Sequence, residues 1–71
     1  MVKAEVGKRY RLVRDYEVRD EKTGTLTFLI RRGEVVTVRE IEPEMNRVYL
    51  EGLAQPAALE AFQVHIRPAD E

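Results

Sequence analysis

Few side chains in this sequence could carry nucleophilic or acid–base chemistry. It has one histidine, His65, and neither cysteine nor serine. Only threonine could supply a hydroxyl nucleophile, so no Ser–His or Cys–His pair can form. A metal site with two histidine ligands cannot form within one chain. Because Gln63, His65 and Arg67 alternate with apolar residues, we expect His65 to face solvent on a strand, and we predict neither a metal nor a cofactor.

Three carboxylates offer the remaining route to acid–base chemistry. Glu40, Glu42 and Glu44 occur at every second position, a spacing that would place them on one face of a strand. Pro43 bends the chain within this group and leaves it close to water. Solvated carboxylates with ordinary pKa values are poor general acids. We therefore expect no catalytic residue and predict that the chain is not an enzyme.

Arginines form the most prominent charged group. Five of them fall on the first expected strand and at a later turn: Arg9, Arg11, Arg14, Arg31 and Arg32. Guanidinium groups bind phosphates through paired hydrogen bonds and stack on bases, so these five could form a nucleic-acid-binding face. The sequence pI of about 5.9 is lower than is usual for a dedicated nucleic-acid binder. Glu5, Asp15 and Glu17 interleave with the arginines, and a solvated charged face stays an alternative.

Two tyrosines are candidates for contact with a partner. Tyr10, Phe28 and Phe62 are expected in the core, whereas Tyr16 and Tyr49 are expected to be partly exposed. Tyrosine combines an apolar ring with a polar hydroxyl and is common at protein interfaces. The pair could anchor another protein or a second copy of the chain, or each ring could only cover an opening of the domain. The candidate partner-binding residues are Tyr16, Tyr49, Arg14, Arg31 and Arg32.

The first hairpin follows from alternation and from turn residues. Apolar and charged residues alternate over 8–14, and the pattern continues to residue 18. Residues 20–24 supply a turn whose glycine can adopt positive φ, and residues 25–30 return as a strand. The segment 31–34 is the next break, and its third residue is a glycine, as a type II turn requires.

A second hairpin follows this break. The β-branched run 35–41 predicts a strand. The segment 42–46 interrupts it, because its proline cannot donate a backbone hydrogen bond and its asparagine tolerates left-handed geometry. Residues 47–53 then return, with Val48 and Leu50 on the same face.

The end of the chain changes character. Pro56 precedes strong helix formers, which predicts one or two helical turns over 56–61. Alternation over 62–67 predicts a last short strand, which Pro68 ends. The expected fold is therefore all-β, with five strands that close into a small barrel and so leave few open edges.

Length and composition agree with one small folded domain. A chain of 71 residues is expected to form a single domain over residues 1–71. Hydrophobic residues make up 44% and charged residues 35%, which is too apolar for a disordered tail. The longest apolar stretches, such as 26–30, are far too short to span a membrane, so no membrane partner is expected. No leader-like apolar run follows Met1, and we expect a cytoplasmic location.

Two segments resemble SH3 domains. Residues 26–38 look like the SH3 pattern of a strand, a basic pair, glycine followed by an acidic residue, and a β-branched strand, which spans the family's diverging turn. Residues 12–16, Leu-Val-Arg-Asp-Tyr, are similar to the family's Ala-Leu-Tyr-Asp-Tyr signature and keep Asp15 and Tyr16. The resemblance implies a five-stranded SH3-like barrel with a short helical turn before the last strand. It concerns the fold rather than an activity.

The chain lacks the aromatic residues with which SH3 domains bind polyproline. That groove depends on a tryptophan and on a proline and a tyrosine near the last strand. This sequence has no tryptophan, residues 46–50 offer only Tyr49, and residues 62–66 lack the family's Pro-Ser-Asn-Tyr pattern. Bacterial SH3-like domains without the groove are the nearer comparison, although very small chains of this type can also assemble an enzyme site from several subunits.

The sequence therefore predicts a noncatalytic protein-binding or assembly module, which binds another protein or forms a homodimer. The alternative is a weak nucleic-acid-binding domain that contacts phosphates through its arginine face. Salt-dependent retention on DNA or RNA would separate the two, because phosphate contacts weaken steeply as salt rises.

Overall fold

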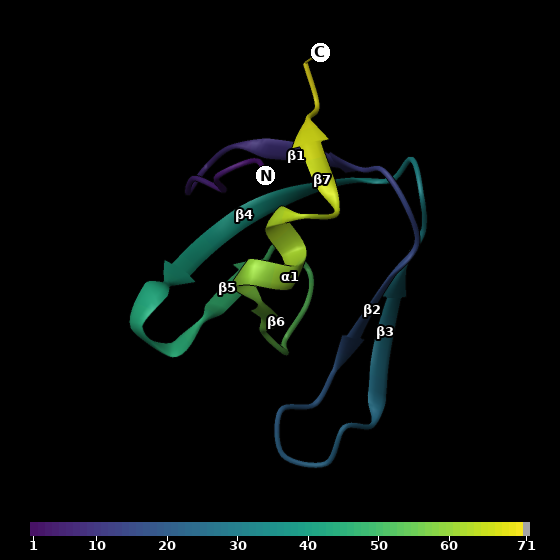
Figure 1. The fold of residues 1–71 in the computed structure, drawn as a ribbon, viewed down its shortest axis with the longest axis vertical. Coiled ribbons are helices and arrows are strands. Elements are labelled where there is room, and N and C mark those ends of the chain that lie inside the picture. Colours follow the sequence, from purple (N-terminus) through teal and green to yellow (C-terminus); the bar gives the residue numbers. More distant parts are fainter. Residues whose placement is uncertain (71) are drawn as a thin grey trace.

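Seven strands in two antiparallel sheets and one α-helix make up residues 1–70, the part of the chain that this computed structural model describes (Figure 1). The strands are β1 (Arg9–Leu12), β2 (Tyr16–Arg19), β3 (Leu26–Ile30), β4 (Val35–Glu42), β5 (Arg47–Leu50), β6 (Ala57–Ala58) and β7 (Ile66–Pro68). A 3₁₀ turn at Pro43–Met45 joins β4 to β5, and helix α1 spans Leu59–Gln63. The larger sheet has the order β6-β5-β4-β1-β7, and β2 and β3 form a separate hairpin. The expected all-β class is confirmed.

The expected continuous strand from residue 8 to residue 18 is wrong, because the chain bends between β1 and β2. Val13 holds the bend by donating its N–H to the carbonyl of His65 at 2.8 Å. Asp15 holds it by accepting the N–H of Arg32 on its carboxylate, also at 2.8 Å. The buried residues of both strands occupy even positions, so the alternation continues across the bend and could not reveal it.

Strand β4 connects the two halves of the larger sheet. Its first part, residues 35–37, pairs with β1, and its second part pairs with β5 from Val38 onward. The register shifts between Val38 and Glu40, and such a bulge bends and twists a strand. The strand expected over 35–41 is confirmed.

The two turns that flank β4 contain left-handed residues where the sequence predicts them. Gly33 has φ +90° in the third position of its turn, which the N–H of Glu34 closes on the carbonyl of Arg31 at 3.1 Å. Asn46 has φ 54° and donates its N–H to the carbonyl of Pro43 at 3.1 Å. Glycine and asparagine are the residues that adopt this geometry most readily.

The helix expected over 56–61 starts later, because Ala57 and Ala58 form β6 and pair with β5. Asn46 then receives the first helical N–H groups. Its carbonyl accepts from Leu59 at 2.9 Å, and its side-chain oxygen accepts from Glu60 at 3.0 Å. These bonds satisfy donors that a helix start would otherwise leave unpaired. No helix within residues 1–70 is long and apolar enough to cross a membrane.

The strand expected over 62–67 is wrong in its first half. Phe62 belongs to α1, and Val64 follows the helix with 53% of its surface exposed. The strand itself is the shorter β7, and Pro68 lies within it, opposite Tyr10. A proline is tolerated there because β7 is an edge strand.

Phe62 lies at the centre of the core, with none of its surface exposed. Its ring centroid is 6.4 Å from that of Tyr10 and 6.4 Å from that of Tyr16. The core positions expected for Tyr10 and Phe62 are confirmed. Phe28 is not a core residue, since 44% of its surface is exposed. Only the end of β3 at Ile30 is buried, and the hairpin carries the rest of the strand away from the core. The exposure expected for Tyr16 is also wrong, since only 7% of its surface is accessible.

Candidate binding groove and charged surfaces

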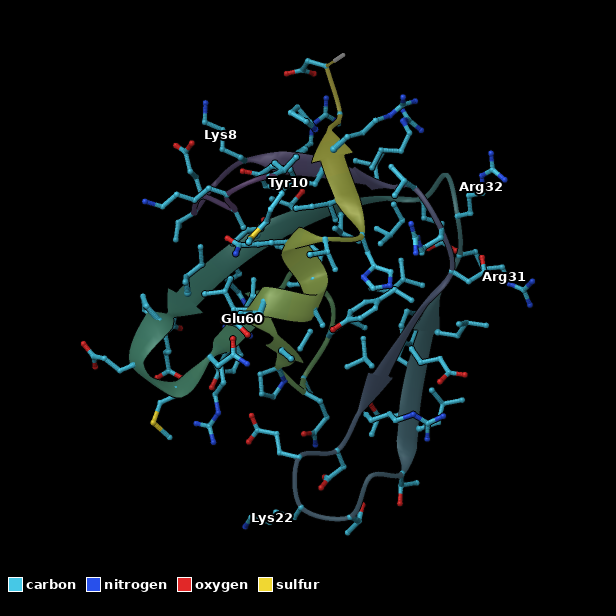
Figure 2. All side chains as sticks on the ribbon, in the orientation of Figure 1. Lys8, Tyr10, Lys22, Arg31, Arg32 and Glu60 are labelled. Atoms are coloured by element: carbon cyan, nitrogen blue, oxygen red, sulfur yellow. The ribbon has the colours of Figure 1, made fainter. Side chains whose placement is uncertain are left out.

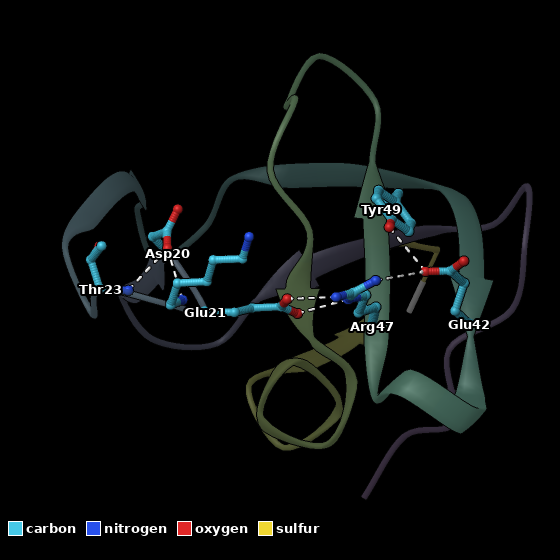
Figure 3. Close-up of polar contacts among 7 residues, drawn as sticks. Asp20, Glu21, Thr23, Glu42, Arg47 and Tyr49 are labelled. Carbon is cyan, nitrogen blue, oxygen red and sulfur yellow. Dashed lines mark hydrogen bonds and ion pairs between the residues drawn. The ribbon is translucent and has the colours of Figure 1, made fainter.

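Tyr49 belongs to a polar network that ties the tip of the β2–β3 hairpin to β5 (Figure 3). Arg47 donates from Nε and Nη2 to the two carboxylate oxygens of Glu21, each at 2.8 Å. Glu42 accepts the hydroxyl of Tyr49 at 2.9 Å and lies 3.7 Å from Nη1 of Arg47. These contacts lower the pKa of Glu21 and raise the pKa values of Arg47 and Tyr49. The Tyr49 hydroxyl is thus occupied within the chain.

The two candidate tyrosines have different surroundings. The Tyr49 ring is half-buried and lies 5.4 Å from the guanidinium carbon of Arg39, within the range of a cation–π contact. The Tyr16 ring packs against Phe62 and against the imidazole of His65, whose centroid is 4.9 Å away. Burial raises the pKa of Tyr16. Tyr16 therefore contributes to the core, whereas Tyr49 keeps an accessible side.

His65 is neither on a strand nor fully exposed, so the expectation of a solvent-facing strand residue is wrong. It lies between α1 and β7, is half-buried, and places Nδ1 2.6 Å from the carbonyl oxygen of Ala61. Because a carbonyl can only accept, Nδ1 carries the proton in this contact. Within residues 1–70, no three His, Asp or Glu side chains are grouped so that they could hold a metal ion.

The five arginines named from the sequence do not form one continuous group. Arg9 lies 3.7 Å from the carboxylate of Asp70. Arg31 and Arg32 both point away from the ribbon at the turn between β3 and β4 (Figure 2), and Arg14 is exposed in the bend after β1.

Two of the five, Arg11 and Arg32, line a hollow of about 170 Å³ together with Arg67. Arg67 was missed from the sequence, because its position opposite Arg11 depends on the register between β7 and β1. We refer to these three residues as the arginine cluster.

A second surface is an elongated hollow between the hairpin and the larger sheet. It consists of two adjoining parts of about 370 Å³ and 260 Å³, which share Phe28, Gly52 and Leu53. We call the whole the β3 groove. Its remaining lining residues are Val18, Thr27, Ile30, Glu34, Val35, Val36, Thr37, Glu51, Ala54 and Gln55. None of these residues had been singled out as a site residue from the sequence.

Two strand edges that lack a neighbouring strand face this groove. Within residues 1–70, β3 pairs with β2 alone, so its second edge has no partner strand. Immediately before β4, the carbonyl of Glu34 accepts the N–H of Leu12 on β1 at 2.9 Å. Alternate residues of an antiparallel strand direct their peptide groups to opposite edges, so Val36 also faces β1 while Val35 faces the groove. On that edge the carbonyl of Thr37 already accepts the N–H of Glu51 at 3.0 Å, so the unpaired stretch of β4 is the peptide group of Val35.

The groove combines apolar side chains with acidic ones. Phe28 and Val35 are 44% and 40% exposed, and Leu53 is half-buried. Glu34 and Glu51, both exposed, line the part of the groove next to β4. No lysine or arginine is among its lining residues. The groove therefore presents apolar surface, unpaired backbone and negative charge together.

No family model, curated protein or solved structure matches this chain.

Proposed function

We propose that this chain is a noncatalytic protein-binding module, which takes an extended segment of its partner into the β3 groove. The observation that carries the proposal is the edge of β3 that has no partner strand. It borders a groove that the exposed ring of Phe28 lines together with Val35 of β4, whose groove-facing edge also has no partner strand. An extended peptide can add to such an edge as a further strand, because its backbone groups pair with those of the edge. Pockets for alternate side chains then provide specificity.

The lining residues indicate the chemistry of the bound segment. An apolar side chain of the partner would pack against Phe28 and Leu53. A lysine or arginine of the partner would be attracted to Glu34 and Glu51, which have no basic neighbour in the groove lining. Because β3 has five residues, a partner strand of about five residues would match it in length.

We further propose that the scaffold is an SH3-like barrel. The strand order β6-β5-β4-β1-β7 supports this, as do the bent central strand β4 and the helix that precedes β7. Tyr16 packs in the core and the chain has no tryptophan, so binding at the β3 groove would differ from polyproline recognition.

The proposal can be tested by selecting linear peptides from a random library against the immobilised domain. Phe28→Asp should weaken binding of the selected peptides at least tenfold, because it places a charge where an apolar side chain should pack. Leu26→Asp is a matched control, since Leu26 lies on the same strand and is 46% exposed but does not line the groove. Equal loss of binding in both variants would contradict the proposal.

A second copy of the chain is another conceivable occupant of the same edge. Light scattering over a concentration series distinguishes the two cases. The proposal predicts a monomer at every concentration, whereas a dimer that Phe28→Asp dissociates would show that the groove serves self-association.

A nucleic-acid interface across Arg9, Arg11, Arg14, Arg31 and Arg32 has less support. Arg9 is paired with Asp70, and one guanidinium nitrogen of Arg11 is bonded to the carbonyl of Gly33 at 2.8 Å. A nucleic-acid strand presents a row of phosphates, and binding it requires several available cations along that row. Of the five, only Arg11 and Arg32 line a common hollow, whose small size suits a single anion.

A further inference from the structure

Arg11 and Arg67 lie directly opposite each other across β1 and β7. Residues paired in this way project to the same face of a sheet, and like charges in this arrangement are destabilising. The neighbour of Arg11 on its other side, on β4, is the uncharged Val35. Two cations are therefore held side by side, and no carboxylate occupies the strand position next to either of them in this row.

Nothing within residues 1–70 neutralises the arginine cluster by direct pairing. The ion pairs formed there involve Arg9, Arg19 and Arg47, and none includes Arg11, Arg32 or Arg67. Asp15 is the carboxylate that contacts the turn, but it accepts the backbone N–H of Arg32 and thereby positions the turn. The cluster thus keeps its full positive charge.

The guanidinium group of Arg11 is held in place. Its Nη1 donates to the carbonyl of Gly33 at 2.8 Å, and Gly33 follows Arg32 in the turn. Gly33 in turn donates its N–H to the carbonyl of Leu12 on β1 at 2.8 Å. A guanidinium group has five N–H donors, so one bond to Gly33 leaves the others for a ligand. The turn and β1 together therefore orient Arg11 toward the hollow that Arg32 and Arg67 share.

We propose that Arg11, Arg32 and Arg67 form a binding site for a phosphate monoester group. The planar guanidinium group of arginine matches the geometry of phosphate oxygens and binds them through paired, charge-assisted hydrogen bonds. A monoester carries about −1.5 to −2 charges at neutral pH, more than a backbone diester, and suits three cations around one hollow better. The hollow of about 170 Å³ shares no lining residue with the β3 groove, so this site does not depend on peptide binding.

The site can be tested by NMR titration of the ¹⁵N-labelled chain with inorganic phosphate, followed at the arginine Nε–H signals. Saturable shifts are expected for Arg11, Arg32 and Arg67, and sodium chloride at the same ionic strength should not reproduce them. Arg67→Gln should weaken phosphate binding at least tenfold. Arg9→Gln is the matched control, because Arg9 is also exposed on β1 but is paired with Asp70, and its affinity should stay within twofold of the unmodified chain.

A comparison of two oligonucleotides identifies the source of the phosphate. An oligonucleotide with a 5′-phosphate should bind more tightly than the same oligonucleotide without it. Equal binding of the two oligonucleotides would overturn the monoester assignment in favour of backbone diesters. Absence of saturable shifts with phosphate, or equal weakening by Arg9→Gln and Arg67→Gln, would overturn the site itself. None of these outcomes bears on binding of peptides at the β3 groove.

Discussion

Two phenylalanines of this chain differ in burial, and the difference predicts how each contributes to stability. Phe62 is fully buried between Tyr10 and Tyr16, whereas Phe28 is 44% exposed. Phe62→Ala should lower the free energy of unfolding by about 3–5 kcal/mol, because it leaves a cavity in the core. Phe28→Ala should cost clearly less. Urea denaturation of the two variants measures both effects, and similar losses would contradict the placement of Phe28.

The opposed pair of Arg11 and Arg67 predicts an unusual effect of removing a surface charge. Arg67→Gln should raise the free energy of unfolding by about 0.2–1 kcal/mol in phosphate-free buffer, because it removes repulsion across β1 and β7. The gain should shrink at high salt, which screens exposed charges. Thermal melts at low and high salt measure it. A loss of stability at low salt would show that Arg67 has a favourable contact instead.

The attachment of the β2–β3 hairpin depends on an ionised glutamate. Hydrogen bonds from Arg47 hold the pKa of Glu21 below its ordinary value. A carboxyl group whose folded pKa is depressed adds stability above its unfolded pKa, about 4.3, and this contribution is lost as pH falls through the folded pKa. The protection factors of amides in β2 and β3, which correct for the intrinsic pH dependence of exchange, should therefore decrease as the pH falls below about 4.3.

Two variants separate Glu21 from its acidic neighbour in this pH dependence. Asp20 also has a lowered pKa, because its carboxylate accepts the backbone N–H groups of Thr23 and Lys22 at 3.1 and 2.8 Å. Glu21→Gln should remove only the part of the acid sensitivity that comes from the bond to Arg47, and Arg47→Gln should remove the same part. Unchanged acid sensitivity in both variants would show that this ion pair does not hold the hairpin.

The elements that alternation and turn residues define locally could be predicted from the sequence. The turn at residues 20–24, the turn at Gly33 and the strand β4 are all present where expected. The later start of α1 could not be predicted, because it depends on pairing of Ala57 and Ala58 with β5. That pairing joins segments whose relative register no local pattern determines.

The candidate sites were less predictable than the strands and turns, because they too depend on how distant segments pair. Arg11 and Arg32 were identified by their charge, whereas Arg67 joins them only through the register of β7. Phe28 has the aromatic character and spacing of a core residue, and only the path of the hairpin beyond the core exposes it. Long-range geometry therefore decides which side chains share a surface.

At the scale of the whole molecule, the β2–β3 hairpin lies to one side of α1 and β6 (Figure 1). It is attached at both ends, and the β3 groove lies beside it. At its base, the N–H of Gly33 bonds the carbonyl of Leu12, and at its tip Glu21 bonds Arg47. These two attachments limit the movement of β3 relative to β4. A groove that is largely formed before binding costs less conformational entropy when it takes up a peptide.

Amide hydrogen exchange at Val35, with and without a selected peptide, tests strand addition at the groove most directly. Val35 directs its peptide group toward the groove, on an edge where no strand of residues 1–70 pairs with it. If the partner enters as an extended strand between β3 and β4, exchange at β3 and at Val35 should slow when the peptide binds. Unchanged exchange at both places, with protection confined to β6, β7 or the arginine cluster, would contradict the proposed function.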